Sequence, residues 1–165
     1  MIVTVPEADA IVGDWRRAHT GDAPAGLPAH VTILFPFVPA ARLQEAEERA
    51  AEIVATEPAF DLAFERTARF PGLLYLAPEP PEPFLSLTAA FAEGWPEHPP
   101  YEGEHDTVVP HLSVAHADDE VLDAIAAELE LQLPLRTRVS EASLFVEDEN
   151  ARWHEHRRLP LGERA

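Results

Sequence analysis

The sequence predicts an α+β fold in one domain made of two similar lobes. Its 165 residues, with 46% hydrophobic and 25% charged side chains, suffice for a single sizeable core. Segments with the helical spacing of apolar residues alternate with segments that have strand spacing. In each half, a helix and a loop precede a strand with the pattern His-x-Thr or His-x-Ser, and a helix and more strands follow it. This repeated order indicates an internal duplication within residues 1–165, and it suits two lobes that face each other.

In the first half, apolar periodicity and proline positions define the expected elements. Pro6 suits the first turn of a helix, and Ile11 and Trp15 recur at helical spacing. In the segment 60–65, large apolar residues occupy every second position, which is strand spacing. The expected elements are a strand over 1–5, a helix over 6–19, a strand over 29–37, a helix over 40–56, and strands over 60–65, 68–70 and 73–76.

The second half begins after a proline-rich break over 78–83. Phe84, Leu87 and Phe91 fall on one face of a helix, which predicts a core-facing stripe. Asp118 is placed to cap the next helix. The expected elements are a helix over 84–95, a long polar connection over 96–107, a strand over 108–115, a helix over 118–130, and strands over 133–138, 141–146 and 152–161.

The chain is strongly acidic. Its 30 acidic and 12 basic side chains give a formal net charge of -18, and every basic side chain is an arginine. Such a surface repels nucleic-acid backbones and anionic membranes, so we do not expect a long nucleic-acid duplex as a partner. A phosphate ligand must therefore bind in a pocket where hydrogen-bond donors outweigh the surrounding acidic groups.

The chain contains no cysteine, which excludes disulfides, thiolate nucleophiles and cysteine-based zinc sites. The segment 1–6 has neither a charged region nor a long apolar run, so we expect no signal peptide and no membrane span. We accordingly expect a cytoplasmic monomer.

Two short motifs carry the candidate chemistry, His30-Val31-Thr32 and His111-Leu112-Ser113. In an extended chain, residues two apart point to the same side, so each histidine shares a face with its hydroxyl partner. One such motif could be a hydrogen-bonded core histidine beside a serine. Two motifs with apolar flanks, in matching places of the two halves, favour a paired site.

Phosphodiester cleavage needs such a pair of histidines. A base activates the attacking oxygen and an acid protonates the leaving oxygen, and histidine, with an ordinary pKa of about 6.5, can do either. The hydroxyls of Thr32 and Ser113 are suited to donate hydrogen bonds to the phosphate oxygens, where negative charge builds up. This scheme needs neither a metal nor another cofactor, and it leaves open which histidine is the base.

The sequence resembles the 2H phosphoesterase superfamily, the group of 2′-5′ RNA ligases and cyclic phosphodiesterases, whose signature is two His-x-Ser/Thr motifs. The similarity extends through residues 28–37 (PAHVTILFPF), 74–76 (LYL), 95–101 (WPEHPPY), 109–114 (VPHLSV) and 159–162 (LPLG). It implies a bilobal, pseudo-two-fold α+β fold in which two antiparallel sheets line a central cleft and helices pack outside. It also implies that both motif strands meet in the cleft, where His30, Thr32, His111 and Ser113 are the catalytic groups.

One position departs from the family pattern. Several members carry a basic residue soon after the second motif, and this chain has His116. Phosphate affinity then depends on pH through His116, or on an arginine from elsewhere. Arg69 and Arg138 are the candidates for that arginine.

Several other residues have both a functional and an ordinary interpretation. Phe35 and Tyr101 are candidates to stack on a nucleobase, and each is also a normal core residue. The three tryptophans are assigned to packing, and the two histidines of His154-Glu155-His156 to an exposed strand instead of a metal site or a cleft wall. A metal cluster is a weaker interpretation of four other histidines and their acidic neighbours, because their spacing matches no zinc motif; the four are His98, His105, His111 and His116.

We therefore expect a metal-independent phosphoesterase that acts on a 2′,3′-cyclic phosphate, or on a 2′-5′-linked phosphodiester, of a small nucleotide or an RNA end. Ligation of 2′-5′ ends is the reverse of the same chemistry. The alternatives are a non-catalytic module on the same fold, which binds a nucleotide or a protein, and a zinc hydrolase. The intact pair of motifs favours the enzyme over the module, since a decayed site would lose a histidine first.

Overall fold

The computed structural model describes residues 1–103 and 107–163, excepting the side chains of Ala40, Tyr101 and Glu102. Helices and strands alternate as the sequence predicts, and three short 3-10 helices join them at Pro6–Ala8, Ala40–Arg42 and Pro100–Gly103. The elements are β1 (Ile2–Thr4), α1 (Asp9–His19), β2 (His30–Thr32), α2 (Leu43–Val54), β3 (Phe60–Phe70), β4 (Leu73–Glu79), α3 (Glu82–Gly94), β5 (Leu112–His116), α4 (Asp119–Glu130), β6 (Leu135–Val139), β7 (Glu141–Glu147) and β8 (Trp153–Pro160).

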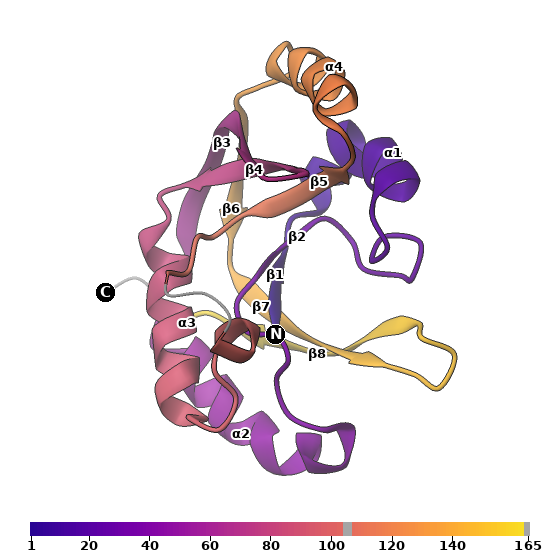
Figure 1. The fold of residues 1–165 in the computed structure, drawn as a ribbon. Coiled ribbons are helices and arrows are strands. Elements are labelled where there is room, and N and C mark those ends of the chain that lie inside the picture. The colour runs from indigo at the N-terminus through magenta and orange to yellow at the C-terminus, as the bar shows by residue number, and fades with distance from the viewer. Residues whose placement is uncertain (104–106, 164–165) are drawn as a thin grey trace.

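The strands form two four-stranded sheets in the orders β2-β1-β7-β8 and β5-β4-β3-β6 (Figure 1). All pairings of neighbouring strands are antiparallel. Each motif strand therefore lies at one edge of its sheet, beside β1 in the first sheet and beside β4 in the second. The two sheets are thus built alike around their motif strands, and the expected bilobal, pseudo-two-fold α+β fold with two antiparallel sheets is confirmed.

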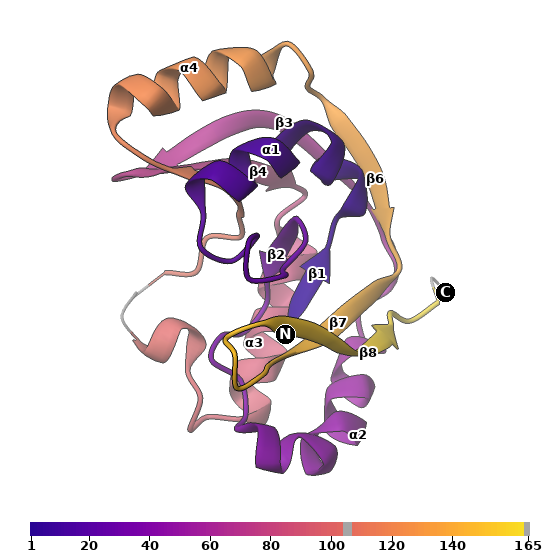
Figure 2. The same cartoon turned by 90° about the vertical axis from the view of Figure 1, so that its right-hand side faces the viewer.

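The helices lie outside the sheets, with α1 and α4 at one end of the molecule and α2 and α3 at the other (Figures 1 and 2). Helix α1 follows β1 in the chain but packs on β5, in the second sheet. Helix α3 follows β4 but contacts the first lobe, where the Thr88 hydroxyl donates to the carbonyl of Ile33 at 3.0 Å. The lobes therefore do not coincide with the halves of the sequence, since each sheet also takes two strands from each half.

A single cluster of buried apolar side chains runs through both lobes. The stripes that the sequence predicts on the helices are buried in it, for example Leu122, Ile125 and Leu129 of α4. The Phe60 and Phe84 rings meet edge to face, 5.3 Å apart, and join β3 to the start of α3. This shared core ties both motif strands to one rigid framework.

Strand bounds differ from those expected, and three of the differences bear on the motif strands or on the sheet of β5. The strand expected over 29–37 is only the three residues of β2, because its partner β1 is equally short and Pro36 has no N–H to donate. The two strands expected over 60–65 and 68–70 are one continuous strand, β3, with a register shift between Phe64 and Thr67. The strand expected over 108–115 begins only at Leu112, so His111 directly precedes it.

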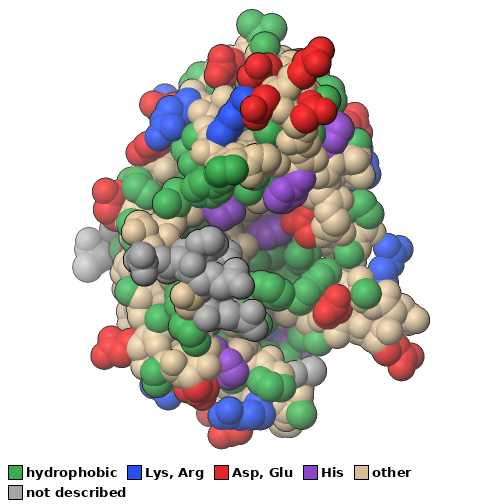
Figure 3. Space-filling model, in the orientation of Figure 1, with side chains coloured by type: hydrophobic (Ala, Val, Ile, Leu, Met, Phe, Trp, Pro, Cys, Tyr) green, Lys and Arg blue, Asp and Glu red, His purple; other side chains and the backbone are tan. Residues whose placement is uncertain are grey.

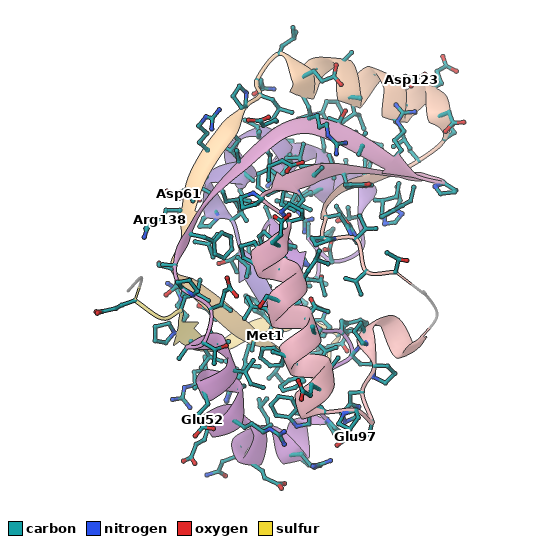
Figure 4. All side chains as sticks on the ribbon, turned by 90° about the vertical axis from the view of Figure 1, so that its left-hand side faces the viewer. Met1, Glu52, Asp61, Glu97, Asp123 and Arg138 are labelled. Carbon is teal, nitrogen blue, oxygen red and sulfur yellow. The ribbon has the colours of Figure 1, made fainter. Side chains whose placement is uncertain are left out.

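Apart from Arg16, which is buried, the charged side chains of the described residues lie on the outside of the molecule. Figure 4 shows Glu52, Glu97 and Asp123 at its periphery, and Asp61 beside Arg138 on the outer edge of the second sheet. Within residues 1–103 and 107–163, no helix has the length and apolar character needed to cross a bilayer.

Candidate active site

The two motif strands lie side by side although they come from different sheets. β2 contacts β5 directly, and both cross the middle of the molecule in Figure 1. His30 is the first residue of β2, and His111 immediately precedes β5. The fold therefore brings the two His-x-Thr/Ser motifs to one region, as the sequence predicts.

Both histidines are oriented in the same way by the backbone. The Nδ1 atom of His30 lies 2.7 Å from the carbonyl oxygen of Pro28, and the Nδ1 atom of His111 lies 2.8 Å from that of Val109. A carbonyl oxygen only accepts hydrogen bonds, so Nδ1 carries the proton in each ring. The Nε2 atom of each neutral imidazole is then left with a lone pair, which can take up a proton and give it back.

His30 is a buried histidine, with 8% of its surface exposed. The pKa of its imidazole is lowered to about 4, chiefly by burial and also by the Arg16 guanidinium, while the Pro28 carbonyl and the Asp22 carboxylate act in the opposite direction. The Asp22 Oδ2 atom lies 4.0 Å from the Nε2 atom of His30. His30 is thus neutral near pH 7 and offers the lone pair of Nε2.

His111 is only partly buried, against two aromatic rings. The rings of Phe70 and Tyr75 are in edge-to-face contact with the imidazole, with centroids 5.3 and 5.5 Å away. Burial lowers the pKa of His111, the nearby His116 lowers it further, and the Val109 carbonyl opposes this shift. The two histidines therefore have the same orientation but unequal environments.

The two hydroxyl residues of the motifs are available to a ligand. Thr32 and Ser113 are partly exposed. Within residues 1–103 and 107–163, neither hydroxyl makes a hydrogen bond to another protein group. They can therefore donate to an oxyanion without first breaking a bond within the protein.

A pocket of about 250 Å³ opens beside His30 and Thr32. Figure 3 shows histidine side chains gathered around a hollow in the middle of this face, among hydrophobic side chains. Most of the lining is apolar, which is typical of pockets that bind small organic molecules. The pocket is lined by Met1, Ile2, Asp22, Leu27, His30, Thr32, Phe35, Phe145 and Trp153.

The pocket lining includes Phe35 and Trp153, and the sequence predicted a place in the site only for Phe35. Phe35, a candidate for nucleobase stacking, lines the pocket with 53% of its surface exposed. Trp153 also lines the pocket, and its ring lies 6.1 Å from that of Phe35, so the assignment of Trp153 to packing was incomplete. The sequence did carry a signal for this. Trp153 begins a strand whose next five residues are all charged or histidine, and such an exposed strand is a poor place for a core tryptophan.

Sequence reasoning missed Arg16 and Asp22. Arg16 is almost fully buried behind the motifs, and Asp22 lines the pocket from the loop between α1 and β2. The signal for Arg16 was its place one helical turn after Val12, on the apolar face of α1, where an exposed arginine would not fall. No comparable pattern marks Asp22, which lies among turn residues.

The two arginines proposed as phosphate ligands lie elsewhere. Arg138 is on β6, at the opposite edge of the sheet from β5, and is paired with Asp61 at 2.9 Å. Arg69 is paired with Asp123 at 2.6 Å, and neither arginine lines the pocket. Two strands separate Arg138 from β5, which sequence spacing could not show because it does not give the strand order of the sheet. His116, the remaining candidate, is an exposed residue at the end of β5.

The remaining candidates are histidines and a tyrosine. The side chain of Tyr101 and the whole of His105 lie outside the described residues. His154 is bonded to Asp148, and His156 to Glu47, so these two exposed imidazoles are directed to separate partners. In the part of the chain that the structure describes, no group of three or more histidine, aspartate or glutamate side chains is placed to hold a metal ion.

Known structures resemble the whole chain. TT0787 of Thermus thermophilus superposes with a TM-score of 0.64 at 17% identity, over 99% of this chain and 97% of that chain. LigT of E. coli in complex with 3′-AMP superposes with a TM-score of 0.62 at 16% identity, over 97% and 95% of the two chains. LigT in complex with ATP gives 0.58 at 19% identity, over 98% and 96%. At these identities the likeness establishes the fold.

Sequence comparison identifies the family. A search of the curated proteins found no match. The family model described as the 2′-5′ RNA ligase superfamily matches residues 4–151, which include both motifs and nearly the whole fold. Since this match spans most of the chain and agrees with the expected family, the protein belongs to the 2′-5′ RNA ligase superfamily of 2H phosphoesterases.

Proposed function

We propose that the protein is a phosphoesterase that needs no metal and hydrolyses the 2′,3′-cyclic phosphate of a small nucleotide or an RNA end. The observation that carries this proposal is the matched orientation of the two histidines. Each imidazole is held through Nδ1 by the carbonyl two residues before it, and each keeps Nε2 for proton transfer. A purely structural role for one histidine does not account for a second histidine that is oriented in the same way.

The reaction divides between the two motifs. One Nε2 atom takes a proton from water as the water oxygen attacks phosphorus. The P–O bond to one ribose oxygen then breaks, and that oxygen receives a proton from the Nε2–H group of the other histidine. The Thr32 and Ser113 hydroxyls donate to the non-bridging oxygens, where charge accumulates. The same steps with a 5′-hydroxyl in place of water break the P–O3′ bond and leave a 2′-5′ linkage, so 2′-5′ ligation is open to the same site.

The pocket beside His30 suits a nucleobase. Aromatic rings of Phe35 and Trp153 border it, and stacking on aromatic rings is how proteins hold bases without reading their sequence. LigT has been crystallised with 3′-AMP, ATP and NADP+, which are nucleotides of this size class. We therefore expect a mononucleotide, or the last nucleotide of an RNA, to place its base in this pocket.

The proposed roles make a geometric prediction. The Nε2 atoms of His30 and His111 should contact opposite sides of one phosphate group. A structure of the protein with 2′-AMP or 3′-AMP checks this directly. A phosphate bound to only one of the two motifs contradicts the division of roles.

The activity is tested with 2′,3′-cyclic AMP and 2′,3′-cyclic CMP in the presence of EDTA. We expect turnover by the wild type, and a loss in kcat of about 10²- to 10⁴-fold in His30→Ala and in His111→Ala, because each removes one proton-transfer group. His154→Ala, an exposed histidine on β8 outside the pocket, should retain wild-type activity.

Two other outcomes would contradict the proposal of a metal-independent phosphoesterase. Nucleotide binding without turnover would identify a non-catalytic module. Turnover that EDTA abolishes and zinc restores would identify a metal enzyme.

A further inference from the structure

One charged side chain is buried in the interior, and the proposed chemistry does not use it. Among the described residues, Arg16 is the only Asp, Glu or Arg that is buried, with 1% of its surface exposed. Burying a guanidinium is costly unless its charge is paired and its N–H groups are bonded. Asp22 supplies the opposite charge, with Oδ2 3.0 Å from the Nη2 atom of Arg16.

The other hydrogen bonds of Arg16 go to the backbones of the two motif segments. Its Nη1 atom donates to the carbonyl of Ser113, in the second motif, at 2.6 Å. Its Nη2 atom donates to the carbonyl of Pro28, just before the first motif, at 3.2 Å, and lies 3.5 Å from that of Leu27. One planar guanidinium therefore joins the backbone of β5 to the segment that enters β2.

The bond to Pro28 reaches the first histidine by one further step. The carbonyl oxygen of Pro28 accepts both from Arg16 and from the Nδ1–H group of His30. The carboxylate that pairs with Arg16 also lies 4.0 Å from the Nε2 atom of the same imidazole. Arg16 itself does not line the pocket, so it has no contact with a ligand bound there.

We propose that Arg16 is a positioning residue that sets the spacing and orientation of the two His-x-Thr/Ser motifs relative to each other. The fold makes this possible because α1 belongs to the first half of the chain but packs on β5 of the second. Arginine suits the role because its fork of donors is rigid and reaches acceptors on two sides at once. A lysine keeps the charge but offers a single nitrogen, so it can hold only one of the two segments firmly.

This inference rests on the proposed function, and it differs from a purely structural role for Arg16. A residue that only stabilises the fold would change the unfolding midpoint but leave the folded enzyme with its normal kcat. A residue that sets the distance between two proton-transfer groups changes kcat in the folded enzyme. Misplacement by about 1 Å is enough to lower kcat by about 10²-fold.

The test compares Arg16→Lys with Arg17→Lys, the neighbouring position on α1. Arg17 is exposed and, among the described residues, is paired only with Asp14, so it is a matched control for loss of a guanidinium. With 2′,3′-cyclic AMP well below each unfolding midpoint, we expect Arg16→Lys to lose about 10²-fold in kcat with KM within about threefold of wild type. Arg17→Lys should match the wild type. A folded Arg16→Lys variant with wild-type kcat, or with a loss only in KM, overturns the proposal.

A second variant covers the case in which Arg16→Lys does not fold. Asp22→Asn leaves the guanidinium in place but removes its charged partner, so the hold on the Pro28 side loosens while the bond to Ser113 remains. We expect about a tenfold loss in kcat. If Arg16→Lys is unfolded and Asp22→Asn keeps wild-type kcat, Arg16 is a structural residue only and the proposal fails.

A readout without turnover separates this proposal from the proposed function. Inorganic phosphate is titrated into protein labelled with ¹⁵N, and the imidazole signals of His30 and His111 are followed by NMR. Both histidines should respond with one shared Kd in the wild type, and with separate or lost responses in Arg16→Lys. That result without any turnover of cyclic nucleotides contradicts the proposed function but supports the positioning role. Turnover together with unchanged phosphate responses in Arg16→Lys contradicts the positioning role alone.

Discussion

At the scale of single residues, the sequence predicted a pair of histidines but not the groups that orient their rings. The motif pair was visible because both copies keep the same pattern in matching places. The carbonyl groups of Pro28 and Val109 were not visible, because any residue supplies a carbonyl and only the backbone path decides where it points. The same holds for Arg16, whose partners are mostly backbone atoms.

The environments of the two histidines make a prediction about pH. We expect kcat/KM for 2′,3′-cyclic AMP to be bell-shaped, with both limbs below pH 6.5. With His30 as the base, activity rises as the pH passes its pKa of about 4, because the base must be unprotonated. The acid must be protonated, so activity falls as the pH passes the pKa of His111, which burial holds below 6.5.

This profile is measured from initial rates at constant ionic strength between about pH 3.5 and about pH 9, a range that covers both limbs. Circular dichroism at each pH separates loss of activity from loss of fold. A maximum above pH 6.5, or a single sigmoid, would contradict the assignment of two histidines with lowered pKa values.

At the scale of elements, helices were predicted more accurately than strand order. The apolar stripes fixed α2, α3 and α4 to within a few residues, because a helix satisfies its own backbone and buries one face. Strand spacing cannot say which strand pairs with which. The sequence therefore could not place the hairpin of β7 and β8 beside β1, which is what brings Trp153 to the pocket.

The place of that hairpin predicts a role for Trp153 in binding the base. Stacking of a base on an aromatic ring contributes about 1–3 kcal/mol, so Trp153→Ala should raise KM for 2′,3′-cyclic AMP by about 5- to 150-fold. The kcat should change much less, because the ring is not a proton-transfer group. His154→Ala, on the same strand but bonded to Asp148, serves as the control and should leave KM unchanged. An unchanged KM in Trp153→Ala would contradict binding of the base in this pocket.

At the scale of the whole molecule, the two lobes share one core, and this predicts a single cooperative unfolding transition. Phe84 is fully buried and packs its ring against Phe60, so Phe84→Ala should lower the free energy of unfolding by about 3–5 kcal/mol. Urea unfolding followed by circular dichroism and by tryptophan fluorescence measures it. Leu85→Ala, at a neighbouring position that is 37% exposed, should cost much less. Two separate transitions would show that the lobes are independent domains.

The net charge of -18 makes a prediction about substrate length. Repulsion between the acidic surface and a polyanion weakens as salt screens it. For an oligonucleotide with a 2′,3′-cyclic end, KM should therefore fall as sodium chloride rises from about 20 mM to about 200 mM. The KM for 2′,3′-cyclic AMP should change less over the same range. An oligonucleotide KM that rises with salt, as for proteins that release counterions from nucleic acids, would indicate a local basic contact surface.

The strand orders also make each half of the chain depend on the other. Strands β1 to β4 precede helix α3 and β5 to β8 follow it, and each sheet takes two strands from each of these sets. Half of the chain alone would therefore hold only two strands of each sheet, and two-stranded pieces are marginally stable in water at best. Each motif consequently owes its place in the molecule to strands that lie on the other side of the chain's midpoint.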